Sequence, residues 1–124
     1  MLRMPIRAIM PVLKVHDFEG TLRFYEDILG FTSAWRTRDE GGETALLEWG
    51  DSSVMLSTAQ HLGAGKPTFT GTLYFEMTGV PELWERLQSK TTVVWPLSKM
   101  DSGTMEFGIR DPEGYTLAFS EDRA

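Results

Sequence analysis

The pattern of apolar residues runs through the same order twice, and this repeat limits the folds open to a chain of 124 residues. The order is one apolar segment, one amphipathic stretch with helical spacing, and three further strand-like segments. The first copy covers about residues 8–59 and the second about 72–121, with a connection over 60–71. The repeat predicts a single α+β domain of two βαβββ modules. We expect each cupped, mixed sheet to pack its outer face on a helix and to leave its inner face concave.

The helix signals are clear in both modules. Apolar residues from Phe18 to Leu29 recur at helical spacing and predict a helix over about 18–29. Asp17 is a candidate N-cap, because its carboxylate can accept amide protons of the first turn, and Gly30 suits the C′ position. A second stripe begins at Val80, with Pro81 in the first turn, where a missing N–H costs nothing.

Strand-like segments flank both predicted helices. They are expected at about residues 8–15, 32–38, 44–49, 53–58, 72–77, 92–96, 104–110 and 115–120. Pro11 interrupts the first segment and, because it has no N–H donor, is expected at an edge, a bulge or a hinge. The side chain of Asp111 is expected to cap the turn Asp111-Pro112-Glu113-Gly114.

Composition narrows the classes of partner and compartment. The formal net charge of −6 disfavours binding to nucleic-acid phosphates. The chain has no cysteine, which excludes disulfides, zinc–thiolate sites and cysteine nucleophiles. No segment reaches the length of a membrane span, and the first residues lack the apolar core of a signal peptide. We therefore expect a cytoplasmic protein that binds neither nucleic acid nor membrane.

Several short motifs lie near the two ends of the chain. They are Pro11-Val12-Leu13, Val15-x-Asp17, Phe24-Tyr25 and Leu29-Gly30-Phe31, and then Met105-Glu106-Phe107-Gly108-Ile109-Arg110-Asp111-Pro112-Glu113-Gly114. Together with the repeat, these motifs resemble the opening and closing segments of the glyoxalase/bleomycin-resistance/extradiol-dioxygenase superfamily, also called vicinal oxygen chelate. The resemblance covers about residues 8–121. It implies paired βαβββ modules, usually assembled as dimers with a cavity in each cupped sheet.

Metal-using members of this superfamily place one ligand on the first strand and one on the last strand of each module. The resemblance assigns these positions to Met10, Leu56, Thr72 and Ala118, and the repeat supports the assignment, because both pairs differ by 62 residues (72 − 10 and 118 − 56). Catalytic metals in such sites need imidazole or carboxylate donors. Because these four side chains supply neither, we predict no metal site, no cofactor and no catalytic residue.

The metal-free bleomycin-resistance branch of the superfamily is the better match. In that branch, a proline equivalent to Pro11 lies where the first strand crosses to the partner subunit. The resemblance therefore implies a homodimer in which Pro11 is the hinge of an exchanged N-terminal strand. One position departs from the drug-binding pattern, since Ser102 stands where that branch carries a tryptophan before the closing hairpin.

Aromatic and acidic side chains on the predicted strands are the candidates for ligand contact. Tyr74 and Glu76 are assigned to the concave face, and Glu106 is expected to point inward because it alternates with Phe107. A carboxylate in a cavity needs a cationic partner, which is either a group of the ligand or an arginine of the chain. The aromatic residues have core or dimer contact as their alternative role. The predicted ligand-binding residues are Met10, Trp35, Arg38, Trp49, Leu56, Tyr74, Glu76, Met100 and Glu106.

Two weaker signals have structural interpretations. His16 and His61 are candidates for acid–base catalysis, but surface imidazoles are the favoured interpretation. The segment Gly63-Ala64-Gly65-Lys66 matches only part of a phosphate-binding loop and is interpreted as a flexible connector.

The sequence thus favours a metal-free protein that binds a small hydrophobic or amphipathic ligand, such as a cationic antibiotic, in its cavity. The alternative is a metal-dependent lyase, isomerase or dioxygenase of the same superfamily with atypical ligands such as Glu76, Glu106 and His16. A structural or regulatory partner domain is a third possibility, and no motif argues for it directly.

Overall fold

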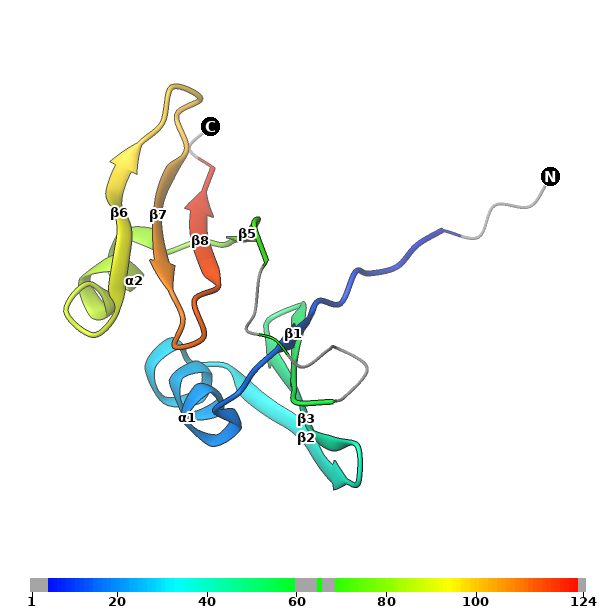
Figure 1. Ribbon diagram of the computed structural model, residues 1–124. Helices are drawn as coiled ribbons and strands as arrows, with labels where there is room; N and C mark the ends of the chain where they lie inside the picture. Colours follow the sequence, from blue (N-terminus) through cyan, green and yellow to red (C-terminus); the bar gives the residue numbers. More distant parts are fainter. Residues whose placement is uncertain (1–4, 60–64, 66–68, 123–124) are drawn as a thin grey trace.

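A computed structural model describes residues 5–59, 65 and 69–122 (Figure 1). Over these residues the chain forms two four-stranded mixed sheets with the strand orders β1-β4-β3-β2 and β5-β8-β7-β6. The strands are β1 (Val12–Lys14), β2 (Thr32–Asp39), β3 (Gly42–Trp49), β4 (Ser52–Ser57), β5 (Thr72–Glu76), β6 (Thr92–Lys99), β7 (Met105–Arg110) and β8 (Thr116–Glu121). The predicted α+β fold of paired modules is confirmed. In the described part of the chain, no helix is long and apolar enough to cross a membrane.

The helical segment of module one keeps its predicted bounds but changes character midway. The α-helix α1 (Phe18–Arg23) continues directly into a π-helix, η1 (Phe24–Leu29). Asp17 caps the start by accepting a hydrogen bond of 3.0 Å from the backbone N–H of Gly20. Gly30 ends the segment with a φ of 106°, a left-handed conformation that favours glycine. In module two, α2 (Val80–Leu87) begins with the predicted proline in its first turn.

The first strand is shorter than the predicted segment 8–15. Pairing with β4 begins only where the carbonyl of Pro11 accepts the N–H of Met55 at 2.9 Å. Proline has no N–H donor to extend the ladder, which explains the late start. Residues before it form an extended arm that projects from the body of the protein (Figure 1), with Ile6 and Ile9 both 86% exposed.

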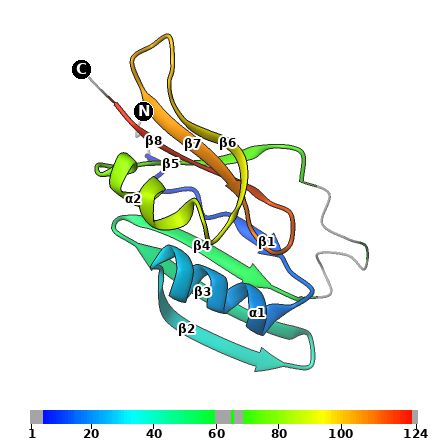
Figure 2. The same ribbon diagram turned by 90° about the vertical axis from the view of Figure 1, so that its left-hand side faces the viewer.

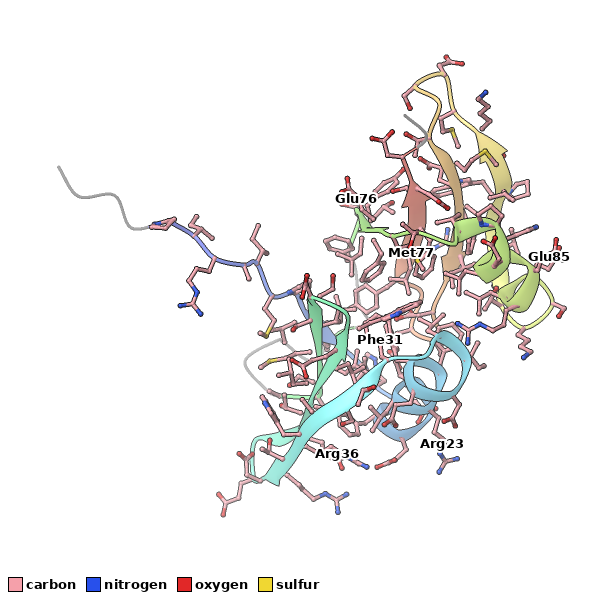
Figure 3. All side chains as sticks on the ribbon, turned by 180° about the vertical axis from the view of Figure 1, so that it is seen from behind. Arg23, Phe31, Arg36, Glu76, Met77 and Glu85 are labelled. Atoms are coloured by element: carbon pink, nitrogen blue, oxygen red, sulfur yellow. The ribbon has the colours of Figure 1, made fainter. Side chains whose placement is uncertain are left out.

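The apolar faces of the two sheets pack against the helices, and aromatic side chains connect the two modules. Both α1 and α2 lie on the same side of the molecule, in front of the sheets in the view of Figure 2. Phe31 joins the modules, with its ring centroid 5.9 Å from that of Phe75 and 5.2 Å from that of Trp49 (Figure 3). Trp49 in turn lies 6.1 Å from Phe119. One continuous aromatic cluster therefore sets the positions of both sheets.

The turn between β7 and β8 adds polar contacts between the modules. The hydroxyl of Tyr25 donates to Oδ2 of Asp111 at 2.7 Å, and the two side chains are almost fully buried. Glu113 accepts the backbone N–H of Asp17 at 2.9 Å, just before α1. The predicted capping role of Asp111 is also confirmed, because its Oδ1 accepts the backbone N–H of Glu113 and of Tyr115, each at 2.9 Å.

Candidate functional site

The second sheet has a concave face opposite its helix, and we call this face the second floor. Residues that pair across neighbouring strands share a face of the sheet. Three such rows form the second floor: Thr72–Thr116–Arg110–Thr92, Tyr74–Ala118–Gly108–Trp95 and Glu76–Ser120–Glu106–Ser98. The alternate residues of the same strands, including Phe107, Leu117 and Phe119, are fully buried on the helix side. The second floor is therefore aromatic at its centre, with a row of threonines and one arginine at one end and an acidic row at the other.

A hydrogen bond joins the aromatic row of the second floor to the acidic row. The hydroxyl of Tyr74 donates to Oε2 of Glu106 at 3.0 Å. Partial burial and this bond to Glu106 both raise the pKa of the Tyr74 hydroxyl, so the phenol remains a donor at neutral pH. Tyr74 is 55% exposed, so much of its surface is open to contact. The arrangement presents an acceptor carboxylate beside an open aromatic surface.

The first sheet has a concave face of different chemistry, which we call the first floor. Its central row is apolar and consists of Val12, Met55, Leu46 and Trp35. Val12 and Trp35 are 42% and 40% exposed, which is high for side chains of this type. A ligand or a second protein surface of apolar character would be needed to cover this row.

A groove runs along β5 between the arm and the start of β4. One part, of about 440 Å³, is lined by Arg7–Pro11, Asp51–Val54 and Thr72–Phe75. An adjoining part, of about 380 Å³, is lined by Trp49–Ser52 and Phe75–Thr78. The groove has the size of small-molecule sites in proteins and adjoins the second floor at Tyr74 and Glu76.

The structure brings five of the nine predicted ligand-binding residues to the groove or to the second floor. Met10 and Tyr74 line the first part of the groove, Trp49 and Glu76 line the second, and Glu106 is bonded to Tyr74. Trp49 also belongs to the aromatic cluster between the modules, so its alternative core role applies as well.

Three further predicted residues lie elsewhere. Trp35 is on the first floor. Arg38, near the end of β2, forms an ion pair of 3.3 Å between its Nε and Oε1 of Glu43. Met100 follows β6 in a turn, where its backbone bonds that of Thr104. None of these three lines the groove.

The assignment of Leu56 to the concave face is wrong. Leu56 is fully buried and pairs with Leu13 and Ala45 on the helix side, whereas Met55 lies on the first floor. The reason is a difference of one residue between the modules. Val12 pairs with Met55, a separation of 43 (55 − 12), but Tyr74 pairs with Ala118, a separation of 44 (118 − 74). A one-residue change in register moves a side chain to the opposite face.

The residues at the would-be metal positions do not fit a catalytic divalent ion. With the corrected register they are two methionines, a threonine and an alanine, namely Met10, Met55, Thr72 and Ala118. Thioether, hydroxyl and methyl groups are not the donors that such metals need. Within residues 5–59, 65 and 69–122, no three His, Asp or Glu side chains converge in a way that would hold a metal ion.

The histidine and glycine-loop signals do not contribute to this site. His16 is half exposed, and its Nδ1 lies 3.4 Å from Oε1 of Glu113, at the contact between the modules. His61 lies outside the described residues, as does the segment 63–66 apart from Gly65.

Comparison with known protein families shows which family the chain belongs to. A model of the Glyoxalase/Bleomycin resistance protein/Dioxygenase superfamily matches residues 8–119. The chain belongs to this superfamily. No curated protein sequence matches it.

Several solved structures share the fold of this glyoxalase-superfamily chain. TnmS3, an antibiotic binding protein from Streptomyces sp. CB03234, superimposes with a TM-score of 0.81 at 18% identity, covering 98% of this chain and 100% of that one. A superfamily member from Sphaerobacter thermophilus gives 0.78 at 19% identity, with coverage of 97% and 100%. Lactoylglutathione lyase from Agrobacterium tumefaciens gives 0.72 at 19% identity, with coverage of 95% and 96%. At these identities the likeness concerns the fold.

Two residues at the centre of the second floor, Trp95 and Gly108, are not among the predicted ligand-binding residues. Trp95 lies directly over Gly108, in the row of Tyr74. A signal for Trp95 was present, because it follows Trp35 by 60 residues (95 − 35), close to the period of the repeat. A glycine inside a predicted strand also marks close approach of another group, and here that group is the indole ring.

Proposed function

We propose that this glyoxalase-superfamily chain binds and sequesters a small amphipathic molecule without a metal ion, using the second floor and the adjoining groove. The observation that carries the proposal is the bond between Tyr74 and Glu106 at the edge of an open aromatic surface. Aromatic faces provide contact area for a planar ligand, while a single carboxylate fixes its orientation.

The charge of the second floor supports a ligand with a cationic or hydrogen-bond-donating group. Glu76 and Glu106 lie in the same row, on either side of Ser120. Arg110 is the one cation among the described residues of the three rows, and its Nη1 donates to the carbonyl of Gly114 at 3.3 Å. The carboxylate of Glu106 therefore has the Tyr74 hydroxyl as its described partner and remains available to a cation.

A titration with proflavine, a planar aromatic cation, tests this proposal. Isothermal calorimetry is expected to show stoichiometric binding, and Glu106→Gln is expected to weaken it about tenfold or more, because a hydrogen bond to a charged group contributes about 1.5–3 kcal/mol. Glu85→Gln is the matched control, since Glu85 lies on α2, away from the second floor (Figure 3).

Two results would contradict the proposal. One is equal weakening by Glu106→Gln and Glu85→Gln, which would show that only net charge matters. The other is stoichiometric divalent metal in the purified protein together with lyase, isomerase or dioxygenase activity that chelation removes.

We also propose that the chain works as a homodimer whose N-terminal arm packs on a second copy. The arm is extended and apolar, and the exposed residues Ile6, Ile9, Met10 and Val12 continue into the open first floor. Covering such apolar surface is favourable by about 25 cal/mol per Å².

Light scattering after size exclusion is expected to give twice the chain mass of 14.0 kDa. A variant that lacks residues 1–9 is expected to weaken the dimer at least tenfold, whereas Arg7→Gln, which keeps the apolar residues, is expected to leave it intact. A wild-type monomer at high micromolar concentration would contradict the proposal.

A further inference from the structure

The ring of Trp95 occupies a slot that exists only because residue 108 is glycine. A Cβ atom placed on Gly108 would lie 2.5 Å from Cζ3 and 2.6 Å from Cε3 of the indole, which is closer than real contacts allow. Gly108 does not have a positive φ, so its backbone conformation is one that alanine also adopts. The missing side chain therefore serves the ring above it and not the backbone.

Burial of the indole in this slot has a cost in free energy. Its Nε1 is buried, and no described group accepts a hydrogen bond from it. A buried donor without a partner costs free energy that it regains when it reaches water or an acceptor. The ring is also flanked by register shifts in the β6–β7 pairing, between Val93 and Trp95 and between Trp95 and Ser98. Contact with Gly108 thus favours this position of the Trp95 ring, whereas the unpaired N–H opposes it. The ring also lies on a locally irregular strand.

The equivalent position of module one shows the other arrangement. Trp35 also follows a register shift, between Ser33 and Trp35, but it pairs with Leu46 and not with a glycine. Its side chain is 40% exposed on the first floor. The same structural position therefore carries a tryptophan that lies flat where the partner is glycine and is more exposed where the partner has a side chain.

We propose that Trp95 determines the ligand specificity of the second floor by leaving the slot over Gly108 when a planar ligand binds. This inference rests on the proposed function and specifies its ligand class as flat, single-layer aromatic molecules that carry a cationic or donor group. Raising the ring uncovers the flat surface formed by Gly108 and Ala118, presents an aromatic face opposite Tyr74, and frees the indole N–H for water or for an acceptor on the ligand. Glu106 then orients the charged end of the ligand.

Indole N–H resonances in a ¹H–¹⁵N spectrum report the position of the ring directly. The chain has four tryptophans, and Trp95→Phe identifies the cross peak of Trp95 by its loss. In the unliganded protein, Gly108→Ala is expected to shift this peak and to speed its exchange with solvent, because the ring can no longer lie in the slot. Titration of the wild-type protein with proflavine is expected to move the same peak toward its position in Gly108→Ala.

Binding measurements complete the test. Trp95→Phe is expected to weaken proflavine at least tenfold, and amantadine, a cation of compact non-planar shape, is expected to bind the wild type at least tenfold more weakly than proflavine does. If Gly108→Ala does not fold, the wild-type titration and Trp95→Phe still decide the matter.

The outcomes separate the two proposals. Proflavine binding that leaves the Trp95 peak in place and is unaffected by Trp95→Phe would overturn the inference about Trp95 while the proposed binding function stands. Absence of proflavine and amantadine binding to the wild type would overturn the proposed function and the ligand class with it, even where Gly108→Ala shifts the peak.

Discussion

Replacing Asp111 by alanine is expected to lower the free energy of unfolding by about 3 kcal/mol, because it leaves buried donors without an acceptor. Three donors converge on this carboxylate: the Tyr25 hydroxyl at 2.7 Å and the backbone N–H groups of Glu113 and Tyr115 at 2.9 Å each. Tyr25 is fully buried and Asp111 is 5% exposed, so water does not readily replace the lost acceptor. Urea unfolding at neutral pH measures the change.

Asparagine is the matched control at the same position. Its carboxamide oxygen can accept both backbone N–H groups, and its NH₂ group can donate to the oxygen of Tyr25. We expect Asp111→Asn to cost about 1 kcal/mol or less, since both backbone N–H groups keep their acceptor and the Tyr25 oxygen accepts from the new NH₂ group. Equal destabilisation by alanine and asparagine would show that the charge of Asp111 matters more than its hydrogen bonds, contrary to this prediction.

The difference in stability between wild type and Asp111→Asn is expected to depend on pH. Burial raises the pKa of Asp111 above its ordinary value of 3.8, against the lowering effect of its hydrogen bonds. A carboxyl whose pKa is raised on folding binds its proton more tightly in the folded state. The extra stability that comes from this tighter proton binding is therefore complete below pH 3.8 and is lost as the pH rises through the folded-state pKa, whereas the hydrogen bonds to the ionised carboxylate remain. Asparagine does not titrate, so the stability of Asp111→Asn relative to wild type is expected to increase over that pH window.

The alternation of residues along strands and the helix caps were predictable from local sequence, whereas the bond between Asp111 and Tyr25 was not. Asp17 and Gly30 delimit the helical segment as expected, because capping depends on chemistry within a few residues. The turn-capping role of Asp111 is equally local. Its bond to Tyr25 joins residues 86 positions apart, and no periodicity within either module specifies that distance.

The register between paired strands was the other feature that the sequence did not predict. A constant repeat of 62 residues assigned Leu56 to the concave face, but the first module is one residue shorter between its first and last strands, so Met55 takes that place. A shift of this size leaves hydrophobic periodicity almost unchanged, since apolar residues occur at both positions, and yet it exchanges a core side chain for a floor side chain. The candidate site consequently includes residues such as Trp95 and Gly108 that only paired strands bring together.

Phe119→Ala is the second change with a large expected effect, about 3–5 kcal/mol of unfolding free energy, because it removes a fully buried aromatic ring and leaves a cavity. The ring centroid of Phe119 lies 5.3 Å from those of Phe75 and Phe107 and 6.1 Å from that of Trp49. It therefore connects the sheet of module two to the tryptophan of module one. Urea unfolding followed by tryptophan fluorescence measures the loss.

Phe119→Leu separates this stability effect from any effect on the site. Leucine refills much of the volume, so we expect it to cost about 1–1.5 kcal/mol. Phe119 points to the helix side, while its neighbours Ala118 and Ser120 lie on the second floor, because successive strand residues alternate faces. Folded Phe119→Leu is therefore expected to bind proflavine within about twofold of wild type. A tenfold loss of affinity in the folded variant would show that the packing of the aromatic cluster also sets the geometry of the second floor.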